Sequence, residues 1–473
     1  MSRGRSSVFA LTLSLLPLAA PPLAADDWSR FRGANGAGVS TARGLPVEIS
    51  PQKNVDWAVD VPFGRSSPVL AGNRIFLTAI ADGKLTTLAL DRASGRLLWS
   101  RALERSETAT MYHGNDSATP TPVSDGSNVY VLFHEAGLVS YDPSGRERWR
   151  RALGPFRNFY GLASSPVLAG DRLLVVCDQA VGSFVLALDK DTGRELWRTQ
   201  RPGRRESYAT PVLYPGGTDP RQVVIHGSRF VDAYDLVTGR LVWTLPGVSA
   251  GPVSSPALAG DLLFVTGPDQ QEEPIPAFAD ESAKHDANRD GCLATAEVAE
   301  TWIAKHFGFI DQDGNACITA GEWSLMMDEL GTSDWGVFAI RLGQDAPKIA
   351  WNYRKNVSYI PSPLVYEGVF YMARDGIVSS LDPATGALHK RDRLSRDEKM
   401  KVYASPVAAD GKLYFAGVEG HVAVVKAGAQ WEVLAVNDLD DEIYATPAIA
   451  GSSLYVRTKG KLYAFSQSTR AAD

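Results

Sequence analysis

Two acidic segments of the sequence carry oxygen-bearing side chains at a spacing suited to holding a metal ion. In the first, residues 286–297, the oxygen donors fall at positions 1, 3, 5 and 12 of a twelve-residue loop: Asp286, Asn288, Asp290 and Glu297. Gly291 stands at position 6, and Cys292 at position 7 offers its backbone carbonyl. Side chains at the first three positions converge when such a loop winds round an ion, and the final glutamate can close the shell with both oxygens. The segment predicts a site for a hard cation.

A second segment of the same form begins 25 residues later. Its donors at positions 1, 3, 5, 9 and 12 are Asp311, Asp313, Asn315, Thr319 and Glu322, and Cys317 supplies the carbonyl at position 7. Position 6 is Ala316 instead of glycine. Because the sharp turn there favours a positive φ, which a Cβ disfavours, we expect the second loop to bind its ion more weakly than the first.

The donor set indicates the ion, since all of these ligands are hard oxygens and several are carboxylates, as calcium prefers. The spacing is that of the EF-hand loop. Apolar residues recur at helical spacing between the two loops, over 296–309, and again after the second loop: Val298, Trp302, Ile303, Phe307, Phe309, Trp323, Leu325, Met326 and Leu330. We therefore expect helices beside both loops and a paired EF-hand module with two Ca²⁺ sites; the alternative is an acidic, solvated loop.

The cysteines of the two loops occupy the same position, on the short strands that pair in a double EF-hand. Diagonal neighbours across such a pair lie about 7–8 Å apart, near the limit for a disulfide. Whether Cys292 and Cys317 are bonded is left open by the sequence. Cys177 ends an apolar run and is expected in the core.

The acidic loops belong to a segment that interrupts a repeat. Blocks such as SSPVLAGNRIFLT (66–78), SSPVLAGDRLLVV (164–176) and SSPALAGDLLFVT (254–266) recur along the chain. The prolines that mark them are Pro68, Pro122, Pro166, Pro211, Pro256, Pro363, Pro406 and Pro447. Their spacings of 54, 44, 45, 45, 107, 43 and 41 residues give eight units of about 44 residues, with one long insertion, 268–334. That insertion holds fifteen acidic and three basic residues, a net charge of −12, against −6 for the whole chain.

Each unit contains four short alternating strands, the period of a propeller blade. The eighth unit stops near Ser466 after three strands, and Val55–Val59 supplies a lone strand before the first. Pairing the two would close a ring and remove the exposed edges of a linear array. A tryptophan recurs on the fourth strand, and we expect these rings to dock one blade on the next: Trp57, Trp99, Trp149, Trp197, Trp243 and Trp351. Lys390 stands in that place in the sixth unit, where we expect a weaker contact.

These repeats, over about 54–267 and 335–468, resemble those of PQQ-type, quinoprotein-like β-propellers. That group includes quinoprotein alcohol dehydrogenases and the lipoprotein propeller of outer-membrane assembly. The opening Trp28-Ser29-Arg30-Phe31-Arg32-Gly33-Ala34-Asn35-Gly36 also resembles the start of many exported bacterial members. In the dehydrogenases, the resemblance implies PQQ at the propeller mouth beneath a disulfide of adjacent cysteines, with Ca²⁺ and an aspartate base. This sequence has no adjacent cysteine pair, so we expect no PQQ and a binding protein in preference to an enzyme.

The segments entering each innermost strand should lie at the mouth of the propeller. They carry Tyr112, Tyr160, Tyr208, Tyr359, Tyr403, Tyr444, Arg65 and Asp116. These side chains either pack between neighbouring blades or line a surface for a ligand or partner. The sequence leaves both alternatives open.

Composition and the N-terminus limit the function further. With 48 Lys and Arg against 54 Asp and Glu, no basic excess exists to meet nucleic acid. Three cysteines without a CxxC exclude a disulfide scaffold and a thiolate zinc site. Arg3 and Arg5, the apolar run 8–20 and the small residues Ala24 and Ala25 predict a secretory signal peptide. The apolar run is too short to span a bilayer. We expect a periplasmic or secreted protein without a membrane span.

The sequence thus predicts an all-β, eight-bladed β-propeller with a small helical EF-hand pair inserted between the second and third strands of its fifth blade. The expected segments are a signal peptide (1–25), an extended N-terminal segment (26–53), the propeller (54–267 and 335–468), the insertion (268–334) and a tail (469–473). We expect a monomer that binds a protein or polymer partner at the rim or mouth of the propeller. The alternatives are a PQQ- and calcium-dependent oxidoreductase and an outer-membrane assembly factor; the lack of a lipid-anchor cysteine counts against the latter.

Overall fold

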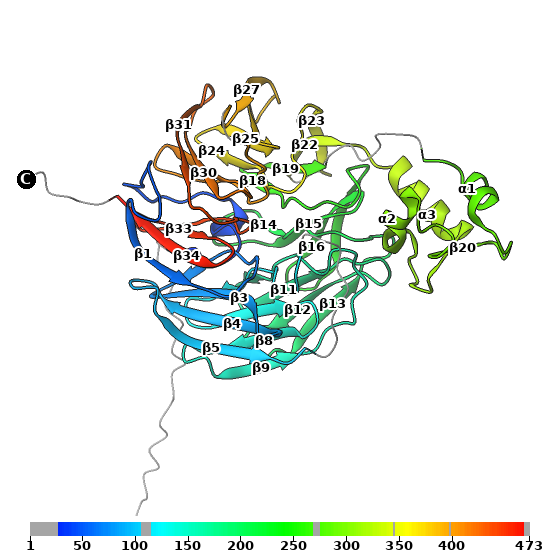
Figure 1. Cartoon of the computed structure of the whole chain (residues 1–473), viewed down its shortest axis with the longest axis horizontal. Helices are drawn as coiled ribbons and strands as arrows, with labels where there is room; N and C mark the ends of the chain where they lie inside the picture. Colours follow the sequence, from blue (N-terminus) through cyan, green and yellow to red (C-terminus); the bar gives the residue numbers. More distant parts are fainter. Residues whose placement is uncertain (1–26, 106–114, 268–274, 344–345, 397–398, 468–473) are drawn as a thin grey trace, which may run out of the picture.

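The repeat units fold into eight four-stranded antiparallel sheets arranged as the blades of a β-propeller (Figure 1). The computed structural model describes residues 27–105, 115–267, 275–343, 346–396 and 399–467. The predicted signal peptide and the C-terminal tail lie outside these residues. The regular elements of the described chain are strands apart from one 3₁₀ turn and three short helices, which confirms the predicted all-β propeller and its eight blades.

The first four blades follow one another in chain order. Their strands are β2 (Val69–Ala71), β3 (Arg74–Ala81), β4 (Lys84–Asp91), β5 (Leu97–Leu103); β6 (Val123–Ser124), β7 (Val129–Phe133), β8 (Gly137–Tyr141), β9 (Glu147–Arg151); β10 (Val167–Ala169), β11 (Arg172–Cys177), β12 (Phe184–Asp189), β13 (Glu195–Gln200); β14 (Val212–Tyr214), β15 (Gln222–Gly227), β16 (Phe230–Asp235) and β17 (Leu241–Pro246). Each short first strand lies innermost, and Cys177 is buried at the end of β11, as predicted.

The last four blades include the interrupted one and the one that closes the ring. Their strands are β18 (Ala257–Ala259), β19 (Leu262–Gly267), β22 (Gly336–Arg341), β23 (Lys348–Tyr353); β24 (Leu364–Tyr366), β25 (Val369–Arg374), β26 (Ile377–Leu381), β27 (Leu388–Arg393); β28 (Val407–Ala409), β29 (Lys412–Ala416), β30 (His421–Lys426), β31 (Glu432–Asp438); β32 (Ala448–Ala450), β33 (Ser453–Arg457), β34 (Lys461–Ser466) and β1 (Val55–Asp60).

The ring closes through the pairing of the two ends of the propeller. Strand β1 forms the outer strand of the eighth blade, with Trp57 opposite Ala464 and Asp60 opposite Lys461 in the β1–β34 ladder. Arg457, which is fully buried, adds a second link, because its Nη1 donates to the carbonyl oxygens of Ser66 (3.0 Å) and Thr78 (2.9 Å) in the first blade. The predicted closure is therefore confirmed.

The repeated tryptophans dock one blade on the next, as predicted. In five cases the indole N–H donates to a carbonyl oxygen in the turn of the following blade: Trp57 to Arg92, Trp99 to Pro143, Trp149 to Lys190, Trp197 to Leu236 and Trp351 to Pro383, at 2.9–3.2 Å. Each ring also covers a glycine of positive φ, where a Cβ would lie 2.5–2.7 Å from the indole: Gly95, Gly145, Gly193, Gly239 and Gly386. The Thr-Gly or Ser-Gly step of the repeat is thus required by the ring that covers it.

Two blades depart from this contact. The indole of Trp243 donates within its own blade, to Gln222 Oε1 at 3.1 Å. Lys390, which replaces the tryptophan in the sixth blade, donates through Nζ to the carbonyl of Trp431 (2.7 Å) and lies 4.3 Å from the centroid of the Trp431 ring. A cation–π contact with the seventh blade therefore takes the place of indole stacking.

The N-terminal segment crosses the inner strands of several blades. Trp28 pairs with Leu70 of β2, and the 3₁₀ turn η1 (Ala34–Gly36) follows. The buried Arg30 and Arg32 donate to the carbonyls of two repeat prolines, Pro211 (2.8 Å) and Pro363 (2.6 Å), in the fourth and sixth blades. Burial lowers the pKa of Arg30 to about 10 and that of Arg32 to about 9. The Trp-Ser-Arg-Phe-Arg-Gly motif thus ties together blades that are not neighbours in the ring.

The insertion leaves the fifth blade after β19 and returns at β22, with Gly267 opposite Gly336 in the ladder. It holds α1 (Phe278–His285), β20 (Cys292–Ala294), α2 (Trp302–Ile310), β21 (Cys317–Thr319) and α3 (Ala320–Gly331), beside the propeller in Figure 1. Its apolar residues form a core of their own. The helix expected over 296–309 begins only at Trp302, because Thr301 caps it by accepting the N–H of Ile303.

The tryptophan contacts lead to a first prediction. Replacing Trp197, which is 9% exposed, by alanine removes an inter-blade hydrogen bond and leaves a cavity over Gly239, so we expect a loss of about 3–5 kcal/mol in unfolding free energy. Equilibrium urea unfolding measures this. The matched control is Trp243→Ala, whose indole bonds within its own blade and whose loss should be clearly smaller. Equal losses would contradict the docking role.

Candidate functional site

The two acidic loops of the insertion are neighbours, joined by a short pair of strands. Strands β20 and β21 pair antiparallel, with Leu293 opposite Ile318, and join the loops at their seventh and later positions. Helix α1 leads into the first loop at Asp286, and α2 leads into the second at Asp311. The structure therefore places the eleven residues expected to bind metal in two adjacent loops on one short ribbon.

In both loops the first and last carboxylates bind backbone N–H groups of their own loop. Asp286 accepts the N–H groups of Asp290 (3.2 Å) and Gly291 (3.0 Å). Glu297 accepts those of Ala287 (3.0 Å) and Ala294 (2.9 Å), so it bridges positions 2 and 9. These bonds wind the backbone round the centre of the first loop.

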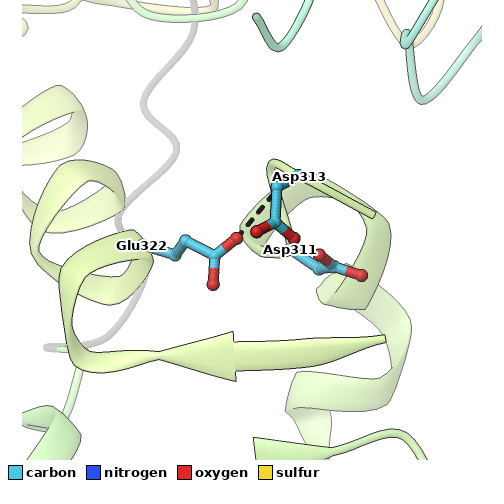
Figure 2. A group of neighbouring side chains, drawn as sticks. All are labelled: Asp311, Asp313 and Glu322. Carbon is cyan, nitrogen blue, oxygen red and sulfur yellow. Dashed lines mark hydrogen bonds between the residues drawn. The ribbon is translucent and has the colours of Figure 1, made fainter. Parts of the chain in front are cut away.

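The second loop repeats this arrangement and gathers three carboxylates. Glu322 accepts the N–H groups of Gln312 (2.9 Å) and Thr319 (2.9 Å), again at positions 2 and 9. The ligand oxygens of Asp311, Asp313 and Glu322 lie within 4.8 Å of one another. Figure 2 shows the three side chains next to one another, and Glu322 also accepts the N–H of Asp313. Burial raises the pKa of Asp311, and the charge of Glu322 adds to this.

Each loop contains two residues in the left-handed backbone region, at positions 4 and 6. In the first loop these are Arg289 (φ 60°) and Gly291 (φ 84°). In the second they are Gly314 (φ 68°) and Ala316 (φ 63°). Each loop therefore holds one non-glycine residue in this region, which costs about 1–2 kcal/mol. The backbone strain expected of Ala316 has a counterpart at Arg289, and the weaker binding expected of the second loop stays a prediction.

A disulfide joins the two loops. Cys292 and Cys317 are bonded, with their Cα atoms 5.5 Å apart. They are diagonal neighbours on the ribbon, because Cys292 lies opposite Thr319 and Cys317 lies opposite Ala294. The bond connects the two residues whose carbonyls stand at loop position 7, and it decides the alternative that the sequence left open.

The second candidate site is a cavity of about 370 Å³ on the propeller axis. Every blade contributes to its lining the serine or threonine that precedes the repeat proline: Ser67, Thr121, Ser165, Thr210, Ser255, Ser362, Ser405 and Thr446. Phe31 of the N-terminal segment, Asn115 and Thr119 also reach it. The prolines mark the repeat in the sequence, but the residue before each of them was not predicted to line the axis.

These eight residues form a closed ring of hydrogen bonds. Each backbone N–H donates to the hydroxyl oxygen of the next blade at 2.9–3.1 Å, from Ser67 to Thr121 and so on to Thr446, which donates to Ser67. Because a serine or threonine hydroxyl can also donate, each of the eight cavity-lining residues keeps one O–H that can donate a further hydrogen bond.

The tyrosines expected at the mouth line the cavity together with Arg65: Tyr160, Tyr208, Tyr359, Tyr403 and Tyr444. They also pack on their neighbours, since the ring centroids of Tyr160 and Tyr208 are 5.3 Å apart and Arg65 lies 4.5 Å from that of Tyr444. Burial raises the pKa values of Tyr208 and Tyr359. These tyrosines therefore both pack on their neighbours and line the cavity, so the two alternatives that the sequence left open hold for the same residues.

Of the other two residues expected at the mouth, one lies elsewhere and one is not described. Asp116 is 9% exposed and does not belong to the cavity lining, because its carboxylate turns back to accept the N–H of Ala118 at 2.7 Å. Tyr112 lies outside the described residues.

Among the helices of the described chain, none has the length and apolar character to cross a membrane.

The similarity to known proteins covers the part of the chain that carries the repeats. The profile of the family described as outer membrane protein assembly factor BamB matches residues 39–186 and 181–472. The outer membrane protein assembly factor BamB of Yersinia pestis is 26% identical over 206 residues, which cover 43% of this chain and 47% of that protein. The chain therefore spans about half the length of the curated relatives it matches.

Solved structures show the same fold at low identity. BamB from Moraxella catarrhalis superimposes with a TM-score of 0.55 and 13% identity, covering 88% of this chain and all of that one. Quinohemoprotein alcohol dehydrogenase from Comamonas testosteroni gives a TM-score of 0.54 and 12% identity, covering 95% of this chain and 82% of that one. The likeness at this level is one of fold.

The hydroxyl ring gives a prediction with an adjacent control. Ser165→Ala removes the acceptor for the buried N–H of Thr121, so we expect a loss of about 1–3 kcal/mol in unfolding free energy. Ser164 is equally buried, and in the described part of the chain its Oγ has no hydrogen-bond partner, so Ser164→Ala should cost little. Urea unfolding of both variants distinguishes them. Equal stabilities would show that the ring contributes nothing to closure.

Proposed function

This chain belongs to the β-propeller family described as outer membrane protein assembly factor BamB, and we propose that it is an exported scaffold that binds a protein partner. The observation that carries this proposal is the extent of the match, which runs from residue 39 to residue 472 and takes in every blade. The role for which the relatives are named, outer membrane protein assembly, indicates the kind of partner. The proposed location is the periplasmic side of the envelope.

We further propose that the insertion is an EF-hand pair that binds two Ca²⁺ ions. The donors fit this ion, because each loop gathers carboxylate, amide and carbonyl oxygens, and the sulfur of its cysteine is held in the disulfide. Asp286, Asn288, Asp290 and Glu297 would hold one ion, with the carbonyl of Cys292. Asp311, Asp313, Asn315 and Glu322 would hold the other, with the carbonyl of Cys317 and a contact at Thr319. The convergence of three carboxylates in the second loop supports this assignment.

Bound calcium supplies positive charge where the chain has concentrated negative charge. The insertion carries a net charge of −12, and its loop carboxylates repel one another. Neutralising them would favour the wound form of both loops and fix the position of the insertion beside the propeller. The surface around the rim and mouth would then be presented to the partner in one arrangement.

The residues of the axial cavity do not fit a quinoprotein centre. Its described lining consists of hydroxyl, phenol, amide, guanidinium and apolar side chains, with no carboxylate to hold Ca²⁺ or to act as a base. The disulfide of this chain joins Cys292 and Cys317 in the insertion, not neighbouring cysteines at the mouth. We therefore derive no oxidation step, and the likeness to the alcohol dehydrogenase remains one of fold.

Calcium binding gives the third prediction. Isothermal titration of the intact protein should show two sites, with affinities that can be as weak as about 10⁻⁴–10⁻³ M, as in extracellular modules. Glu297→Gln and Glu322→Gln should each remove one site, because each loses the residue that closes a loop. Glu300→Gln is the control, since Glu300 is an exposed acid of the insertion outside both loops. Absence of heat and of any change in helicity at millimolar Ca²⁺ would refute binding.

Partner binding gives the fourth. Affinity capture from envelope extract, quantified by mass spectrometry, should enrich a protein of outer-membrane assembly, and the purified pair should associate in solution. We expect tighter association in Ca²⁺ than in EGTA, and no such difference for the double variant Glu297→Gln/Glu322→Gln. Failure of every purified assembly protein to bind the intact chain, with or without Ca²⁺, would contradict the scaffold function.

A further inference from the structure

The insertion contacts the propeller at Arg157, Phe159 and Arg205, next to residues that line one side of the axial cavity. We propose that cation binding in the second loop controls the order of this side of the cavity. This side, which we call the tyrosine wall, consists of Tyr160 and Tyr208, which line the cavity, together with Phe159 and Glu206, which contact them. The proposal rests on the proposed function, because it takes the second loop as a calcium site.

The first contact is made by Arg157, which precedes the third blade. Its Nη1 donates to the carbonyl oxygen of Gln312 at 3.1 Å. Gln312 stands between Asp311 and Asp313, two of the converging carboxylates. The same guanidinium covers position 4 of the loop, since a Cβ on Gly314 would lie 3.0 Å from Arg157 Nη2. Arg157 therefore contacts the backbone between the residues that would hold the ion.

The second contact holds the end of α2, just before the loop. Arg205, which precedes the fourth blade, donates through Nη2 to the carbonyl oxygen of Phe309 at 2.8 Å and lies 4.7 Å from the centroid of its ring. The ring of Phe159 packs on Gly308, where a Cβ would lie 3.3 Å from it. The approach to the loop is thus held by two neighbouring blade connections.

The same two connections carry the wall and are tied to each other by a buried carboxylate. Glu206 accepts the backbone N–H of Phe159 through Oε1 (2.6 Å) and the hydroxyl of Tyr208 through Oε2 (3.3 Å). Phe159 meets Tyr160 edge to face with centroids 4.9 Å apart, and Tyr160 meets Tyr208 at 5.3 Å. Tyr160 and Tyr208 line the cavity. Contacts are continuous from loop to cavity.

The coupling follows from charge. Without a cation, the carboxylates of Asp311, Asp313 and Glu322 repel one another across less than 4.8 Å, which favours opening of the loop. A divalent cation removes this repulsion and fixes the backbone that Arg157 binds. Ordering the loop then lowers the cost of ordering the wall, and by linkage an ordered wall strengthens cation binding.

Hydrogen exchange of the intact protein, followed by mass spectrometry in Ca²⁺ and in EGTA, tests this. Peptides covering 157–163 and 204–210 should exchange at least about fivefold more slowly in Ca²⁺. A peptide covering 442–447, on the opposite part of the cavity, should not change. In the double variant Arg157→Gln/Arg205→Gln, the difference at the wall should disappear while calorimetry still detects calcium.

The matched control removes a contact of the insertion that does not lead to the wall. Arg229, in the turn between β15 and β16, donates through Nη1 to Asp328 Oδ2 (2.7 Å) and Thr332 Oγ1 (2.9 Å) at the end of α3. Arg229→Gln should therefore keep the Ca²⁺ effect on the wall. If it abolishes that effect as the double variant does, the specific route through Arg157 and Arg205 is wrong.

Calorimetry separates this proposal from the one it rests on. Calcium binding without slower exchange at 157–163 and 204–210 would overturn the coupling and leave the calcium function standing. Absence of calcium binding by the intact protein would overturn both. Calcium binding with slower exchange at the wall, lost on removing the two arginines and kept on removing Arg229, would establish it.

Discussion

Eight backbone N–H groups, one from each blade, donate to the hydroxyl of the next blade, and the last of these bonds returns to Ser67. A ring of this kind exists only when all of its members are present, so each blade fixes the position of its two neighbours. The following proline has no N–H to satisfy, so the polar groups of this step are all taken into the hydroxyl ring. Further from the axis, the tryptophan contacts between blades and the β1–β34 pairing hold the same ring of blades together.

The direction and register of the strands explain why the fifth blade tolerates a long insertion. Antiparallel strands alternate in direction, so the connection between the second and third strands of a blade opens on the same face as the connections that enter the innermost strands. The ladder resumes with Gly336 opposite Gly267, and no register is lost. The insertion therefore emerges beside the mouth, where Arg157 and Arg205 of the connections before the third and fourth blades can reach it.

The sequence predicted what repeats or depends on spacing within one loop. The proline markers located all blades, and the lone strand at Val55 located the closure, because each rests on a periodic pattern. It did not predict contacts made to backbone carbonyls, which carry no residue-specific signal. Arg30 on Pro211 and Arg157 on Gln312 are of this kind, and they connect residues 181 and 155 positions apart. The late start of α2 was missed because the cap at Thr301 competes with apolar periodicity over 296–309.

The choice of acceptor in these contacts matters for the charge of the insertion. Arg157 and Arg205 bind carbonyl oxygens, and the insertion carboxylates that pair with propeller arginines, Asp328 and Asp334, lie outside both loops. Within the described residues, the carboxylates of the two loops form no ion pair. Had the arginines bound Asp311 or Asp313, docking would have neutralised the loop and competed with a cation for the same oxygens. Binding to carbonyls instead lets the insertion stay docked while its carboxylates keep their charge, so docking and cation binding can reinforce each other.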